Sequence, residues 1–116
     1  MDQNCSFCTK KGKELVYSTK YFNVFLEEDQ TYLGRCTIST KEHIEDLSNV
    51  TKEKWLDFSE IVKYLEKSAK NSFGAIMFNW ACLMNLAYQR EHPNPHVHWH
   101  FRPRYNENIK FENLEF

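Results

Sequence analysis

The chain has 116 residues, of which 41% are hydrophobic and 16% aromatic, with only three glycines and three prolines. This composition excludes a disordered chain, and we expect residues 1–116 to form a single domain that buries a sizeable core. The formal net charge of −1 gives no basis for binding nucleic acid or a membrane through charge, although it allows a small anionic ligand.

The first thirteen residues are polar and rich in lysine around Cys5 and Cys8. The beginning of the chain lacks the apolar segment of a signal peptide, and the longest apolar stretch, 73–87, is interrupted and too short to span a membrane. We therefore expect a cytoplasmic protein with reduced thiols. In that setting Cys5-x-x-Cys8 indicates either half of a zinc site or a redox motif. No βαβ pattern surrounds it, which favours zinc, in a loop ordered by its ligand.

Three segments rich in β-branched and aromatic residues come next, and we expect them to be strands: 15–18, 21–26 and 32–40. The acidic stretch 27–30 is interpreted as a solvated turn. His43 follows the third strand, immediately before an expected helical turn at 44–47. A lone histidine at such a position is most often a surface residue.

A long amphipathic helix is expected between Thr51 and Gly74. Thr51 is a suitable N-cap, Glu53 lies favourably in the first turn, and Gly74 ends the unit. Apolar side chains recur at three- and four-residue spacing, at Trp55, Phe58, Ile61, Val62, Leu65 and Ala69. This stripe predicts a helix that packs on a sheet and contributes to the core.

The segment from Ala75 to Met84 is an almost continuous apolar run. Its length also permits a buried helix, but its β-branched and aromatic content favours a central strand buried on both faces. Asn85, which follows the run, can be a turn residue. We expect a constrained loop at 91–95 because it contains two prolines. The tail 106–116 alternates weakly, as an edge strand or a surface against a second subunit would.

Histidine alternates strictly with apolar residues over 96–101. On a strand this period places His96, His98 and His100 on one face and the apolar side chains on the other. Neighbours on that face are about 6.6 to 6.8 Å apart and the outer pair about 13 Å, so one metal ion could bind two of them but hardly three. We interpret the cluster as a site with separate roles for the imidazoles, rather than a solvated face or a metal scavenger.

This His-x-His-x-His run, followed by x-x-Pro-Arg, resembles the signature of the histidine-triad family of nucleotidyl hydrolases and transferases. Upstream, Gly34, Lys41 and His43 are in register with the family's strand that enters Pro-Lys-x-His. Cys5-Ser6-Phe7-Cys8 is similar to the Cys-x-x-Cys of the zinc-binding branches. The resemblance covers the chain from Cys5 to Tyr105. The chain differs from the family pattern at Thr40, where proline is usual, at Arg102, where an apolar residue is usual, and in the loop before the triad.

The resemblance implies a role for each histidine. In the family the middle histidine of the triad is the nucleophile, here His98, and the next one, here His100, contacts the phosphate. Zinc-containing relatives complete their Cys-x-x-Cys with two histidines. The implied zinc ligands are therefore Cys5, Cys8, His43 and His96. A closed four-ligand site of this kind is structural and is not expected to activate water.

The resemblance also implies contacts with a phosphate group. Asn85 stands where the family places an asparagine that contacts the phosphate. Arg102 and Arg104 continue the histidine face and are suited to bidentate phosphate binding, although a surface ion pair is the simpler account of at least one of them.

We therefore expect an α+β fold of the histidine-triad type, an antiparallel sheet of about five strands with one long helix, assembled as a homodimer. The expected activity is nucleotide hydrolysis or nucleotidyl transfer at a phosphoanhydride or phosphoramidate bond, through a nucleotidyl-histidine intermediate. The substrate would be a dinucleoside polyphosphate or a nucleoside phosphoramidate. Two alternatives are a non-catalytic nucleotide-binding or interaction module, and a metallohydrolase in which His96 and His98 are joint metal ligands.

Overall fold

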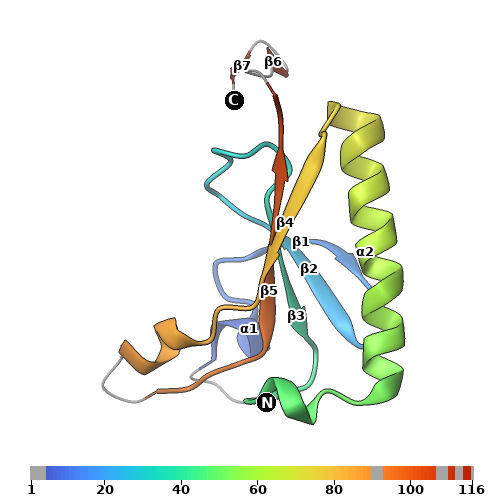
Figure 1. Ribbon diagram of the computed structural model, residues 1–116. Coiled ribbons are helices and arrows are strands. Elements are labelled where there is room, and N and C mark those ends of the chain that lie inside the picture. Colours follow the sequence, from blue (N-terminus) through green and yellow to red (C-terminus); the bar gives the residue numbers. More distant parts are fainter. Residues whose placement is uncertain (1–4, 90–92, 107–109, 112–113, 116) are drawn as a thin grey trace.

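The computed structural model describes residues 5–89, 93–106, 110–111 and 114–115. Within them, an antiparallel sheet of five strands has the order β1-β2-β3-β5-β4 (Figure 1). The strands are β1 Glu14–Ser18, β2 Phe22–Leu26, β3 Cys36–Thr40, β4 Met77–Ala81 and β5 His98–Arg104. One long helix, α2 Lys52–Phe73, lies along one face of this sheet. The described residues thus confirm the expected α+β fold with five strands and one long helix.

Helix α2 has the expected ends. The Thr51 side chain accepts a hydrogen bond from the backbone N–H of Lys54 at 3.4 Å, which satisfies one of the free donors of the first turn. Gly74 ends the helix with a φ of 76°, in the left-handed region that glycine adopts without strain. The apolar stripe predicted from the sequence faces the sheet, because Ile61 and Leu65 are buried.

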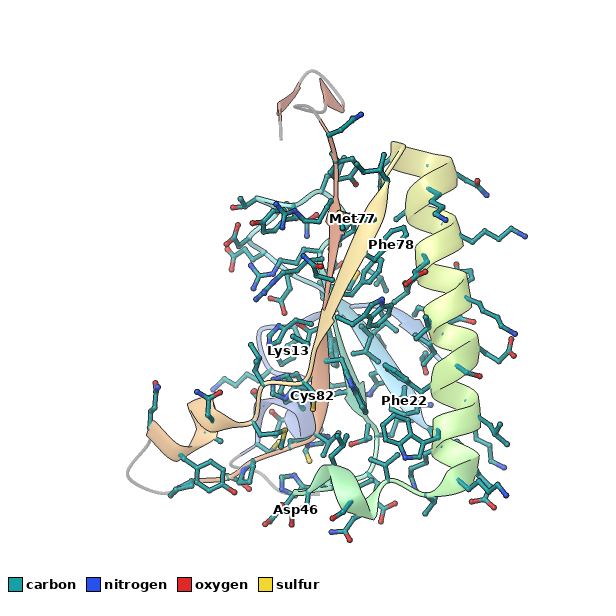
Figure 2. All side chains as sticks on the ribbon, in the orientation of Figure 1. Lys13, Phe22, Asp46, Met77, Phe78 and Cys82 are labelled. Carbon is teal, nitrogen blue, oxygen red and sulfur yellow. The ribbon has the colours of Figure 1, made fainter. Side chains whose placement is uncertain are left out.

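The register of the strands separates two faces of the sheet. Val24, Ile38 and Trp99 are cross-strand neighbours, all buried, and the Trp99 ring lies 4.2 Å from that of Phe58 on α2. Figure 2 likewise shows Phe22 between the sheet and α2 and Lys13 on the opposite side. Since side chains alternate along a strand, the residues beside Trp99 in β5 project away from α2. The histidine face of the sheet is therefore the one that α2 does not cover.

The prediction of a central strand in the apolar run 75–84 is wrong. Strand β4 occupies only Met77–Ala81 and lies at the edge of the sheet. Phe78 and Trp80 of this strand are partly buried against the core. Met77 is 55% exposed and the preceding Ile76 is 53% exposed. The apolar run extends beyond the strand because Cys82 and Met84, which follow β4, also pack against the core.

Several expected boundaries shift. Strand β3 begins at Cys36 rather than at 32, because Tyr32 accepts a hydrogen bond from the Arg35 N–H in a turn and Gly34 has a φ of 89°. The helical turn expected at 44–47 is a 3₁₀ turn, η1, at Leu47–Asn49. A second 3₁₀ turn, η2, spans Asn85–Gln89.

The two ends of the chain also differ from expectation. The N-terminal segment, expected to be a loop, contains a short helix, α1 Ser6–Thr9. The C-terminal strands β6 Lys110–Phe111 and β7 Leu114–Glu115 pair with each other and not with the main sheet, so the described part of the tail is no edge strand of that sheet. The first residues of the expected loop 91–95 lie outside the described residues. None of the described helices is long and apolar enough to cross a lipid bilayer.

Candidate active site and metal centre

Four side chains that are distant in the sequence converge near the start of β5. The ligand atoms of Cys5, Cys8, His43 and His96 all lie within 4.8 Å of one another. Cys5 Sγ is 3.2 Å from His96 Nδ1, Cys8 Sγ is 3.2 Å from His43 Nδ1, and the two Nδ1 atoms are 3.2 Å apart. Both thiols and His96 are buried. The cluster joins the ends of α1 to the turn after β3 and to the residues before β5.

The donor set and its spacing fit a tetrahedral zinc ion. Zn–S bonds of about 2.3 Å and Zn–N bonds of about 2.0 to 2.1 Å imply ligand atoms roughly 3.3 to 3.8 Å apart, close to the separations found. Burial raises the pKa of the Cys5 thiol, so a cation is needed to hold it as the thiolate that binds metal. The four residues therefore can hold one zinc ion, with no ligand position left for water.

The histidines of the cluster direct their Nε2 atoms away from its centre. His96 Nε2 lies 2.7 Å from the backbone oxygen of Thr40 and 3.1 Å from its hydroxyl. His43 Nε2 lies 3.8 Å from the Glu45 carboxylate. Hydrogen-bond partners such as those of His96 are typical of metal-binding histidines, because they fix the orientation of the ring. The Glu45 carboxylate is too distant from His43 Nε2 for such a bond.

The alternation predicted for the triad strand is confirmed in β5. Trp99, Phe101 and Pro103 are buried against the helix side, whereas His98, His100 and Arg102 are half-buried on the other face. His98 Nδ1 lies 2.7 Å from the backbone oxygen of His96. Since a carbonyl oxygen only accepts, Nδ1 carries the proton and Nε2 retains its lone pair.

His98 and His100 stay neutral near pH 7. Burial lowers the pKa of His98. Burial, together with the neighbouring His98 and Arg102, lowers the pKa of His100 to about 4. The two rings lie 5.1 Å apart. Both nitrogens of His100 are buried and lack a hydrogen-bond partner among the described residues, so this side chain can still bind a ligand.

A cavity of about 240 Å³ opens beside these two histidines. Its lining also includes residues that the sequence did not assign to the site, among them Phe7, Lys13, Glu27, Thr37 and Asn94. A second cavity of about 570 Å³ shares Lys13 and Glu27. The second cavity falls in the range of small-molecule sites, roughly 300 to 1,000 Å³, whereas the one beside the histidines is smaller.

Charged groups of both signs face this cavity. Glu27 accepts a hydrogen bond from the Thr37 hydroxyl, and Thr37 is the cross-strand neighbour of His100. Lys13 Nζ lies 4.2 Å above the ring of Phe7. The acidic composition of 27–30 predicts a solvated turn. The structure differs at Glu27, whose partner lies ten residues away on the next strand.

The predicted phosphate contacts are not all brought together. Arg102 lies beside His100, where its charge helps to lower the pKa of that histidine. Arg104 is exposed, and its guanidinium lies 4.7 Å from the ring centre of Tyr32. Asn85 is exposed at the start of η2 and does not line the cavity. The asparagine that lines it is Asn94.

Comparison with known proteins relates this chain to one family. The model of the HIT domain matches residues 9–107. A HIT family protein from Bacillus subtilis superposes with a TM-score of 0.72 at 25% identity, over 90% of this chain and 76% of that one. No curated protein matches the sequence.

Two further solved structures have the same fold. A zinc-bound histidine triad family protein from Mycobacterium smegmatis gives a TM-score of 0.70 at 21% identity, over 88% of this chain and 76% of that one. The diadenosine triphosphate hydrolase of Plasmodium falciparum, in complex with cyclomarin A, gives 0.67 at 20% identity, over 84% and 65%.

Proposed function

We propose, because this chain belongs to the HIT domain family, that it hydrolyses or transfers nucleotidyl groups through a nucleotidyl-histidine intermediate at His98. The substrate carries a phosphoanhydride or phosphoramidate bond, as in dinucleoside polyphosphates and nucleoside phosphoramidates. Among its structural relatives, the Plasmodium protein is a diadenosine triphosphate hydrolase, which supports a substrate of this class.

The observation that carries the proposal is the hydrogen bond of 2.7 Å between His98 Nδ1 and the His96 carbonyl oxygen. It fixes the tautomer in which Nε2 holds a lone pair beside the cavity that His98 lines. In the first step Nε2 attacks the α-phosphorus, the bond from phosphorus to the leaving group breaks, and the leaving group takes up a proton. Water, or the hydroxyl group of an acceptor, then attacks the phosphorus and loses its proton to solvent. The N–P bond breaks, Nε2 recovers its lone pair, and the product is the nucleoside monophosphate or the nucleotidylated acceptor.

Other residues of the cavity suit the charge that develops on the phosphoryl oxygens. His100 offers ring nitrogens without a partner among the described residues, and Lys13 brings a positive charge to the same cavity. Arg102 follows His100 on the same face of β5. Donors held in place before the reaction stabilise such charge most effectively.

We propose that the metal centre is structural. Cys5, Cys8, His43 and His96 form a complete tetrahedral set for zinc, and a zinc ion in such a site supplies structural cross-linking rather than an activated water. A metallohydrolase with His96 and His98 as joint ligands receives less support, because His96 Nδ1 faces the Cys5 thiol and His98 Nδ1 is bonded to a backbone oxygen.

We further propose a homodimer in which the edge strand β4 takes part. Ile76 and Met77 are each more than half exposed beside that edge, and an uncovered edge with apolar side chains favours association. Light scattering coupled to size-exclusion chromatography measures the mass directly, and Met77→Lys should yield a monomer. The cytoplasmic location, like the lack of nucleic-acid and membrane partners, stays a prediction.

The test of the activity is capture of the intermediate. Zinc-loaded protein is incubated with an adenosine phosphoramidate and quenched in base, and the mass should rise by one adenylyl group located on His98 by peptide mapping. His98→Ala should show no adduct and no turnover while it still binds AMP. An adduct on His100, or full turnover by His98→Ala, would contradict the assignment. Binding without adduct or turnover on any nucleotide would favour the non-catalytic module.

A further inference from the structure

Phe7 lies in the sequence between the two cysteines of the metal cluster, and its ring contacts two histidines of the triad. Its ring centre is 4.7 Å from that of His98, with the two planes inclined by 29°, and 5.4 Å from that of His96. Figure 1 shows α1, which contains Phe7, beside β5. One short helical turn thus directs its thiols to the metal cluster and its phenyl ring to the proposed nucleophile.

Helix α1 is attached to the sheet through its two cysteines and through Phe7, whose ring also packs against β2. It has four residues, and its N-cap Cys5 makes no side-chain capping bond; a helix this short does not persist by itself in water. The hydrogen bonds from Thr9 to the Cys5 carbonyl close the turn on itself. Cys5 and Cys8 contact His96 and His43, so the thiols connect the turn to the sheet.

We infer that Phe7 is a positioning residue that makes the orientation of the His98 ring depend on the occupancy of the metal centre. With zinc bound, the two cysteine ligands fix α1, and the phenyl ring covers one face of the imidazole. The ring of His98 is then held by this stack and by its hydrogen bond to the His96 carbonyl. Without zinc, α1 loses its anchor and His98 loses the stack. The functional meaning of the inference rests on the proposed role of His98.

The same coupling extends to a charge of the cavity. Lys13 Nζ lies 4.2 Å from the ring centre of Phe7 and 5.7 Å from that of Phe25, positions in which an ammonium group is attracted to the ring faces. Lys13 and Phe7 both line the cavity beside His98. Metal occupancy therefore sets the place of a cation as well as that of the nucleophile.

The stack can be measured without any substrate. Side-chain protons of His98 are observed by NMR in the zinc-loaded wild type, with His98→Asn for assignment. A proton over an aromatic face resonates upfield, so Phe7→Leu should move the His98 signals downfield, whereas Phe7→Tyr, which keeps a ring, should not. Phe78→Leu is the matched control, because Phe78 stacks on Phe101, whose side chain lies on the other face of the sheet.

The dependence on metal is measured by stepwise removal of zinc with a chelator at 20 °C. The wild-type His98 signals should move to the positions found in Phe7→Leu, and those of Phe7→Leu should stay in place. Tryptophan fluorescence should persist, since the core that contains Trp99 includes neither Cys5 nor Cys8.

Three results would overturn the inference: His98 signals unaffected by Phe7→Leu, wild-type signals unaffected by chelation, or loss of the tryptophan signal at the same chelator concentration. The last would mean that zinc holds the whole fold rather than α1. If Phe7→Leu binds no zinc, the inference is tested by the His98 signals of Phe7→Tyr and by their change as zinc is removed from the wild type. Coupling in a protein that turns over no nucleotide would contradict the proposed function and leave this inference standing.

Discussion

Thr40 fixes the tautomer of His96 through two acceptors, its backbone carbonyl and its hydroxyl group. The hydroxyl donates its proton to the Glu42 carbonyl at 2.8 Å and lies 3.1 Å from His96 Nε2, so toward the histidine it can only accept. The Thr40 carbonyl, at 2.7 Å from the same nitrogen, also accepts. Nε2 therefore carries the proton, and the lone pair of Nδ1 faces the thiols. A threonine at this position, where the resemblance leads one to expect proline, thus supports the proposed metal ligand.

Thr40→Val should weaken zinc binding without unfolding the protein. Valine keeps the volume and the backbone carbonyl but removes the second acceptor, so we expect a loss of up to about 10-fold, the lower end of the effects seen for such partners. Competition with a chromophoric chelator measures the affinity. Ser39→Ala is the control, because the buried Ser39 hydroxyl has no hydrogen-bond partner among the described residues; equal affinities in all three proteins would refute the role of Thr40.

Cys8→Ser should remove zinc and lower the melting temperature. A ligand that binds only the folded state stabilises it by a few kcal/mol at concentrations well above its Kd, which corresponds to a Tm decrease of about 10 °C for a chain of this size. Metal analysis and calorimetry check both effects. Cys82→Ser, at a half-buried thiol outside the cluster, should retain one zinc per chain. Wild-type protein purified without chelator and free of zinc would contradict the metal centre.

The protonation of His100 should make both stability and kcat/KM depend on pH, and both should decrease only below pH 6.5. Burial lowers the pKa of His100 to about 4, so the folded protein keeps it neutral while an unfolded chain protonates its histidines near 6.5. Both states are neutral above pH 6.5, and the free energy of unfolding should fall as the pH drops from 6.5 toward 4. Denaturant titrations and kcat/KM across this range, with zinc content measured at each pH, test the sign. An increase in stability below pH 6 would contradict it.

Arg102→Ala should weaken binding of AMP by about 10-fold, the effect of losing one hydrogen bond to a charged group, and leave the fold intact. The guanidinium lies on the face of β5 that carries His98 and His100. Arg104→Ala is the matched control, since Arg104 is exposed and lies over Tyr32. Isothermal titration calorimetry with AMP gives the affinities. Equal affinities of Arg102→Ala and wild type would contradict the phosphate contact and favour a surface ion pair for Arg102.

The features that sequence predicted well are those with a local cause. Alternation in β5 and the caps of α2 follow from neighbouring residues, and both are confirmed. The edge position of β4 depends on the order of strands across the sheet, which a continuous apolar run does not encode. The pairing of Glu27 with Thr37 was missed for the same reason, since it needs the register between β2 and β3.

The proposed metal centre closes one of the longest loops in the chain, because Cys5 and His96 are 91 positions apart. During synthesis at about 5 to 20 residues per second, roughly 5 to 18 s pass between the appearance of the first thiol and that of the last histidine. The centre can therefore form only after four of the five strands of the main sheet have been made. Until then both thiols must be kept reduced, and a metal ion captured early would be held by incomplete ligand sets.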